Sequence, residues 1–144
     1  MIVVIDYNVE NVRSVCNDFH AKRSEKKRNK WKVCVKAGTK PTDIDVVEGA
    51  ISVENLGAGE ILLTSMDADG TKAGYDNELN RAVTDAINIT VIASGGAGKL
   101  EHLYDAIVDG GVDVVLMASV THFGNYTIKQ MKEYLANRGI PVNL

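Results

Sequence analysis

The sequence has few cysteines and no long apolar run, and each scarcity excludes a class of protein. Its two cysteines, Cys16 and Cys34, are too few for a disulfide framework and do not have CxxC spacing. We therefore expect a reduced, cytoplasmic setting. No apolar run approaches the ~20 residues that cross a bilayer, so no membrane association is expected.

Strong net charge is also missing, since 16 basic and 19 acidic side chains give a formal charge of −3. This balance argues against general nucleic-acid binding. The start, Met1 to Asp6, lacks the basic region and long apolar stretch of a signal peptide, so none is expected. His20, His102 and His122 are scattered without the order of a nucleophilic triad, and we predict no metal site and no cofactor.

One segment is strongly basic. It runs from Lys22 to Lys32 and holds seven cationic residues: Lys22, Arg23, Lys26, Lys27, Arg28, Lys30 and Lys32. The segment is either an anion- or nucleic-acid-binding patch or a solvated loop or hairpin tip. The second interpretation is favoured, because the run has one aromatic neighbour, Trp31, and the rest of the chain is acidic.

Apolar runs alternate with helical patterns along the chain. The runs predict strands at residues 2–6, 31–36, 60–65, 90–94 and 113–119. Helices are predicted at residues 9–19, from Thr42 or Asp43 to Asn55, from a cap at Asp76 through Ile87, at 100–108, and from Tyr126–Thr127 to Gly139. This alternation predicts one α/β domain with a parallel sheet. Ligands are then expected at the loops after Ile5, Ser65, Ser94 and Ser119.

Two of these loops suggest chemistry. Backbone N–H groups of Gly95-Gly96-Ala97-Gly98 can approach an anion at the start of the next helix, with Ser119 adding a hydroxyl. The alternative is that these glycines only form a tight turn. Asp67 and Asp69 could bind a metal, act as acid or base, bind a hydroxyl, or simply cap their loop.

Three stretches closely resemble the cyclase subunit of imidazole glycerol phosphate synthase. They are Leu56 to Asp76, Val91 to Gly98, and Ala118-Ser119-Val120 followed by His122-Phe123. Their order and spacing also match, and the similarity extends from about Ala21 to the C-terminus. The resemblance implies an eight-unit (βα) barrel that uses ammonia from a glutaminase partner to cyclise a phosphorylated ribulosyl substrate.

The resemblance covers only the C-terminal half of that barrel. It implies a half-barrel derived from a TIM barrel, with about five βα units; a flavodoxin-like, five-stranded, doubly wound sheet is the alternative. In the family, two catalytic aspartates and two phosphate sites are divided between the halves. We therefore expect one site for phosphate or a phosphorylated sugar, and little or no activity alone. An active cyclase formed when two chains close a barrel is the alternative.

The resemblance also implies site residues. Phosphate binding falls to Asp69, Gly70, Gly95, Gly96, Ala97, Ala118 and Ser119. Thr64 would line the mouth of the site. His20 precedes Ala21-Lys22-Arg23 where the family has its catalytic aspartate. Either Asp6, at the end of the first strand, or His20 would take that place, and Asp6 is the candidate catalytic residue.

The first residues have a different resemblance. Met1 to Val15 resembles the start of the glutaminase partner, but no Gly-x-Cys-x-Gly elbow follows, so glutaminase chemistry is not expected. These features predict a recombined or engineered chain. Within one domain, 1–144, residues 1–20 would form an added βα unit and residues 21–144 the half-barrel. A homodimer would pair its exposed sheet edges.

Overall fold

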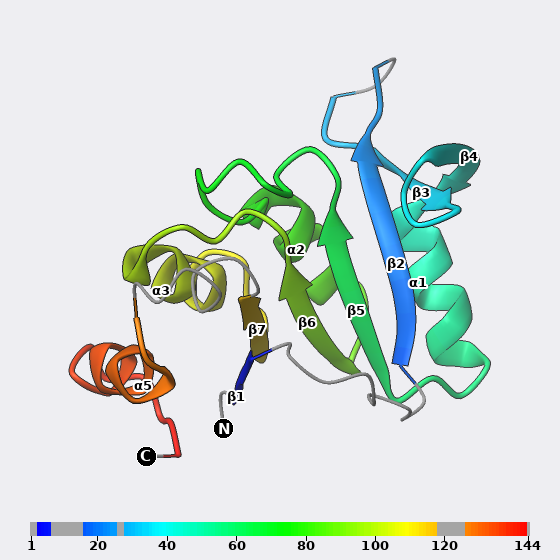
Figure 1. Ribbon diagram of the computed structural model, residues 1–144. Coiled ribbons are helices and arrows are strands. Elements are labelled where there is room, and N and C mark those ends of the chain that lie inside the picture. Colours follow the sequence, from blue (N-terminus) through cyan, green and yellow to red (C-terminus); the bar gives the residue numbers. More distant parts are fainter. Residues whose placement is uncertain (1–2, 7–15, 26–27, 118–125, 144) are drawn as a thin grey trace.

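A single sheet organises the molecule. The computed structural model describes residues 3–6, 16–25, 28–117 and 126–143. Within them, a seven-stranded sheet has the order β1-β7-β6-β5-β2-β3-β4 (Figure 1). The strands are β1 (Val3–Asp6), β2 (Cys16–Arg23), β3 (Trp31–Val35), β4 (Lys40–Asp45), β5 (Glu60–Ser65), β6 (Thr90–Ser94) and β7 (Val114–Met117). In sheet order, the neighbouring strands β1, β7, β6, β5 and β2 pair in parallel. β3 pairs with β2, and β4 with β3, in antiparallel orientation.

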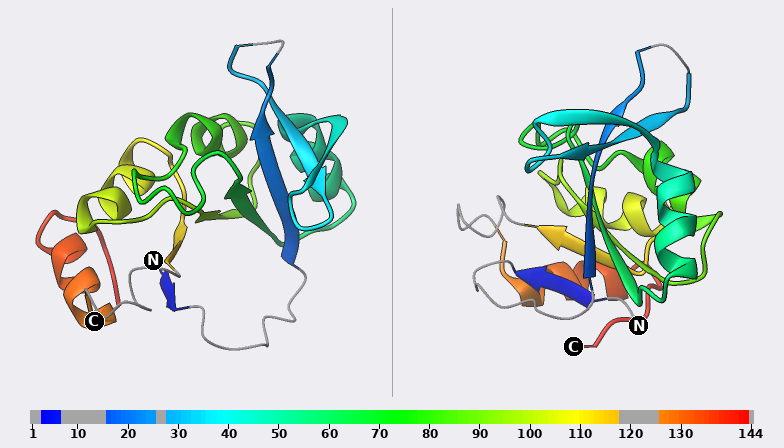
Figure 2. Two further views of the ribbon diagram at one scale, coloured as in Figure 1. Left: turned by 45° about the horizontal axis from the view of Figure 1, so that its top comes forward. Right: turned by 90° about the vertical axis from the view of Figure 1, so that its right-hand side faces the viewer.

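The helices lie along one face of this sheet. They are α1 (Val46–Asn55), α2 (Asn77–Thr84), α3 (Leu100–Val108) and α5 (Ile128–Ala136). Each contacts the next in this order, and Figure 2 shows them as an arc outside the strands. In the part of the chain that the structure describes, no helix is long and apolar enough to cross a bilayer.

This arrangement confirms the half-barrel prediction. The strands β2, β5, β6 and β7 are neighbours in chain order, as successive units of a (βα) barrel are. The flavodoxin-like alternative is wrong, because that fold places its first strand inside the sheet. Here β1 lies at the edge, beside β7.

Alternation along the strands separates two faces of the sheet. In β5, Ile61, Leu63 and Ser65 are buried against the helices, whereas Leu62 and Thr64 are half-buried on the opposite face. Strand side chains alternate between faces, so this period of two assigns one face to the core and the other to the inside of the half-barrel.

The predicted helix at residues 9–19 is wrong for its last four residues, which belong to β2; residues 9–15 lie outside the described residues. Phe19 and Ala21 are buried, while Asp18 and His20 are more exposed, so the burial period is two. The parallel register with β5 (Phe19 beside Leu63) enforces this period. The predicted division between residues 20 and 21 therefore falls inside a continuous strand.

The helix predicted from Thr42 or Asp43 is also partly wrong, because it begins too early. Residues 40–45 form the edge strand β4, and α1 begins only at Val46. Its cap is Asp45, whose carboxylate accepts hydrogen bonds from the backbone N–H groups of Val47 (3.0 Å) and Glu48 (3.1 Å). Pro41 is compatible with an edge strand, where one N–H can stay outside the ladder.

The other predictions agree with the structure except at their ends. The helix predicted through Ile87 stops at Thr84, and residues 118–119 of the last predicted strand lie outside the described residues. The strands predicted at 31–36, 60–65 and 90–94 are β3, β5 and β6, although β3 is antiparallel. Helix α2 is capped by Asp76, which accepts from the Leu79 N–H at 3.1 Å. Helix α5 is capped by Thr127, which accepts from the Gln130 N–H at 3.2 Å.

Truncating a buried leucine of β5 tests the assignment of the core. Leu63 is 1% exposed and Leu56 is 87% exposed. Leu63→Ala should lower the free energy of unfolding by about 2–5 kcal/mol, because it removes buried methyl groups and leaves a cavity. Leu56→Ala should cost less than ~0.5 kcal/mol. Equal losses in urea unfolding would contradict the assigned core.

Candidate functional site

A small cavity lies at the carboxyl edge of the parallel strands. Its volume is about 100 Å³, and its lining comes from the loops after β5 and β6 and from β7. The lining residues are Asp69, Gly70, Lys72, Ser94, Gly95, Gly96, Ala97 and Leu116. Five predicted phosphate-binding residues are therefore brought together: Asp69, Gly70, Gly95, Gly96 and Ala97.

Close packing between the two loops explains the glycines. Gly95 and Gly96 have φ angles of +92° and +107°, a region that disfavours side chains. A Cβ atom on Gly96 would clash with the carbonyl oxygen of Gly74, whose N–H donates to the Gly96 carbonyl at 2.8 Å. The glycine loop is thus required by the fold before any ligand is considered.

The start of α3 is already capped within the protein. Nδ1 of His102 accepts hydrogen bonds from the backbone N–H groups of Gly98 (3.0 Å) and Lys99 (3.2 Å). Of these two donors, the Gly98 N–H was predicted to face an anion. The predicted backbone donors that remain for an anion are therefore those of Gly95, Gly96 and Ala97. A histidine three residues after the N-cap was the sequence signal that could have indicated this cap.

The two aspartates of the β5 loop have different surroundings. Asp67 accepts a hydrogen bond from the Arg23 backbone N–H at 2.7 Å, which is the loop-capping role. Asp69 is exposed and lines the cavity. Among the described residues, no three His, Cys, Asp or Glu side chains are grouped to hold a metal ion.

Three polar residues share one level of the inner face. His20, Thr64 and Ser94 are register partners on β2, β5 and β6, and all three are half-buried. Because Ser94 lines the cavity, Thr64 lies one strand away from it and His20 two strands away. This row connects the predicted mouth residue, Thr64, with the cavity.

The structure describes less of the other predicted site residues, which are Asp6, Ala118 and Ser119. Asp6 ends β1, and its register partner is Met117, one residue beyond the cavity-lining Leu116. Asp6 therefore lies at the carboxyl edge of the sheet, but its register partner is not one of the residues that line the cavity. Ala118 and Ser119 lie outside the described residues.

An ion network that sequence patterns did not predict fixes the end of β2. The Arg23 guanidinium bonds to Glu78 at 2.8 Å and to Asp76 at 3.4 Å, and stacks over the Trp31 ring with 5.0 Å to its centroid. The hydrogen bond that Arg23 donates to the Glu78 carboxylate raises the pKa of the Arg23 guanidinium. Trp31 Nε1 also donates to Asp76 at 3.2 Å. Asp76 and Glu78 lie 45 to 55 residues along the chain from Trp31 and Arg23, so no local pattern could have indicated these contacts.

Two further groups are structural rather than reactive. The Tyr75 hydroxyl donates to the Leu116 carbonyl at 2.8 Å and ties the β5 loop to β7. Burial raises the pKa of Tyr75, so the phenol keeps its proton at neutral pH. Burial likewise raises the pKa of the Cys34 thiol, which leaves it a poor nucleophile.

Comparison with known proteins identifies relatives of this chain. The sequence profile described as "Histidine biosynthesis protein" matches residues 5–127. Imidazole glycerol phosphate synthase subunit HisF of Dehalococcoides mccartyi strain BAV1 is 54% identical over 121 residues, which cover 84% of this chain and 48% of the relative. The HisF subunit of strain CBDB1 gives the same identity and coverage. The chain thus spans about half the length of the curated relatives it matches.

A pair of glycine substitutions tests the loop packing. Gly96 and Gly57 both have positive φ, but a Cβ on Gly57 would meet no atom within 4 Å. Both alanine variants add backbone strain of about 1 kcal/mol. Gly96→Ala adds a clash with the Gly74 carbonyl, so its melting temperature should fall clearly further. Equal shifts in thermal unfolding would show that the two loops are not packed as described.

Proposed function

We propose a function from one premise, which is that this chain belongs to the family of histidine biosynthesis proteins. The chain is a half-barrel related to the cyclase HisF, and it keeps one sugar-phosphate-binding site. That site is the cavity between the loops after β5 and β6, and cyclase activity of the chain alone is little or none. The observation that carries the proposal is the convergence of five expected phosphate-binding residues on this cavity.

The chemistry of the lining supports this ligand. The Lys72 side chain supplies a positive charge, and Ser94 supplies a hydroxyl donor. The Gly95–Ala97 backbone carries no large side chain that would keep a phosphate oxygen away from it. Asp69 repels a phosphate but accepts hydrogen bonds from sugar hydroxyl groups. A phosphorylated sugar satisfies both kinds of lining group, while phosphate alone leaves Asp69 without a role.

Low activity follows from the division of catalytic groups in the family. The resemblance assigns one aspartate to each half of the barrel, and His20 stands where the second half has its own. Asp6 is then the one candidate acid or base that we assign to this chain. A single carboxylate cannot supply both an acid and a base on opposite walls.

A second candidate function is cyclase activity after two chains associate. The sheet of the described residues ends in the edge strands β1 and β4, and its four helices cover one face. A symmetric dimer would cover the inner face and place a second Asp6 opposite the first. A glutaminase subunit, the partner that the resemblance implies, would then supply ammonia.

We also propose a composite origin for the chain. Met1 to Val15 resembles a glutaminase start, while the resemblance to the cyclase extends from about Ala21 to the C-terminus. The junction would lie in β2, just before Ala21, so that residues 1–20 contribute β1 and most of the shared strand β2 to a half-barrel completed by residues 21–144. Recombination or engineering would both produce such a chain.

Removing the cavity's cation tests the phosphate site. Lys72→Met should weaken binding of ribose 5-phosphate by about fivefold or more, because one charge-assisted contact worth about 1 kcal/mol is lost. Lys99→Met removes an exposed charge nearby that does not line the cavity, and should leave affinity unchanged. Isothermal titration calorimetry gives both constants. Equal affinities of wild type and Lys72→Met would contradict the assigned site.

Turnover of the ribulosyl substrate with ammonium separates the two candidate functions. The half-barrel proposal predicts no turnover above background for the wild-type chain, while ribose 5-phosphate still stabilises it. Turnover that appears with chain association and disappears in Asp6→Asn would establish the cyclase alternative. Turnover retained in Asp6→Asn would refute the role assigned to Asp6.

A further inference from the structure

The β2–β3–β4 segment concentrates the positive charge of the chain. Residues 22–40 contain nine of the 16 basic side chains and one of the 19 acidic ones, Glu25. The predicted hairpin is present, since the Ser24 N–H donates to the Lys30 carbonyl at 2.7 Å and β2 pairs with β3. The sugar-phosphate site uses none of these cations.

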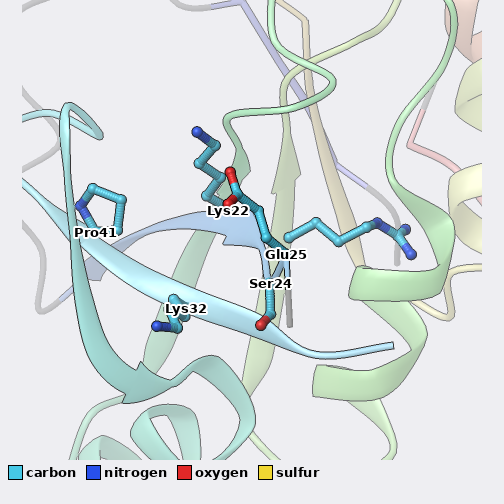
Figure 3. A pocket seen from close by; sticks show the side chains of 6 residues that line it. Lys22, Ser24, Glu25, Lys32 and Pro41 are labelled. Atoms are coloured by element: carbon cyan, nitrogen blue, oxygen red, sulfur yellow. The ribbon is translucent and has the colours of Figure 1, made fainter. Parts of the chain in front are cut away.

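A concave space lies at the base of this hairpin. Its volume is about 200 Å³, and we call it the hairpin cavity. In Figure 3, the side chains of Lys22, Lys32 and Pro41 surround one space beside the hairpin. The complete lining is Lys22, Arg23, Ser24, Glu25, Lys32 and Pro41.

Two lysines that line the hairpin cavity occupy opposite positions on neighbouring strands. Lys22 and Lys32 are direct register partners in the antiparallel pair of β2 and β3. Like charges in directly opposed positions repel and destabilise a sheet. An anion held between the two ammonium groups would convert this repulsion into attraction.

The cations of the hairpin cavity are unequally neutralised. Arg23 bonds to Glu78 and Asp76, and Lys32 pairs with Asp43 at 3.4 Å. Lys22 makes no ion pair with any residue that the structure describes. Glu25 is the one carboxylate in the lining, beside three cations, and Lys22 is the lining cation without an ion pair among the described residues.

The surroundings favour a small anion over a nucleic acid. Trp31, the one tryptophan of the chain, is 3% exposed, and its ring is covered by Arg23 and anchored to Asp76. It therefore offers no platform on which a base could stack. The lining cations converge on a concave space rather than along an extended groove.

We propose that the hairpin cavity is a second anion site, which binds a small phosphate- or carboxylate-bearing molecule between Lys22 and Lys32. It shares no lining residue with the cavity beside Gly96, so the proposal does not depend on the sugar-phosphate function. Binding would stabilise the hairpin by neutralising its opposed lysines.

The test compares two variants of the β2–β3–β4 segment, each of which removes one positive charge. Lys22→Met removes a lining cation, whereas Lys40→Met removes an exposed cation of β4 that is outside the lining. Pyrophosphate and citrate are titrated calorimetrically at constant ionic strength, both variants being made in a Lys72→Met background. Lys22→Met should weaken binding by about fivefold or more, and Lys40→Met should not.

A charge-keeping variant completes the test. Lys22→Arg should restore most of the affinity, because the positive charge at that position returns. Binding of either probe with this dependence supports the site, and the stronger probe identifies phosphate or carboxylate chemistry. Equal weakening by Lys22→Met and Lys40→Met, or binding of a single-stranded oligonucleotide without either small anion, would show a diffuse cationic surface and overturn the proposal.

Discussion

The candidate site depends on a backbone contact between the loops after β5 and β6. Gly74 donates to the Gly96 carbonyl at 2.8 Å, and Gly96 has no Cβ that would meet the Gly74 carbonyl. Tyr75, the next residue, bonds to Leu116 and joins β7 to the same assembly. The ends of β5, β6 and β7 are therefore held around one cavity by contacts of two consecutive residues, Gly74 and Tyr75. A ligand would meet a preformed lining, which lowers the entropic cost of binding.

The cations of the basic hairpin have two kinds of surroundings. Arg23 has a structural role, whereas none has been described for Lys22. Arg23 is held by Glu78 and Asp76 and covers Trp31, so it fastens the end of β2 to the start of α2. Lys22 and Lys32, one residue and nine residues away, occupy opposed register positions. Repulsion of this kind persists in a fold when other contacts outweigh it or when a ligand relieves it. The two proposed anion sites thus differ in origin: one would be formed by loop backbone, the other by side chains in opposed strand register.

Much of the fold could be predicted from the sequence, because local patterns decide it. The apolar run of β5, the cap at Asp76 and the helix start at Tyr126–Thr127 are local signals, and the structure confirms them. β2 was missed because Cys16 and Phe19 also fit a helical spacing, and the parallel partner that selects a strand, β5, lies about 40 residues later. The site was partly predictable: the glycine loop could be located, and the His102 cap has a local signal, but the packing of the loop against Gly74 depends on residues about 20 positions apart that folding brings together.

The central claim is that the loops after β5 and β6 form one preformed site for a phosphorylated sugar. Backbone amide chemical shifts, followed by NMR during titration with ribose 5-phosphate, test it most directly. The account predicts that the largest shifts fall on Gly70 and on Gly95 to Ala97, with little change in the buried strands. Saturable binding that leaves these four amides unshifted would contradict it.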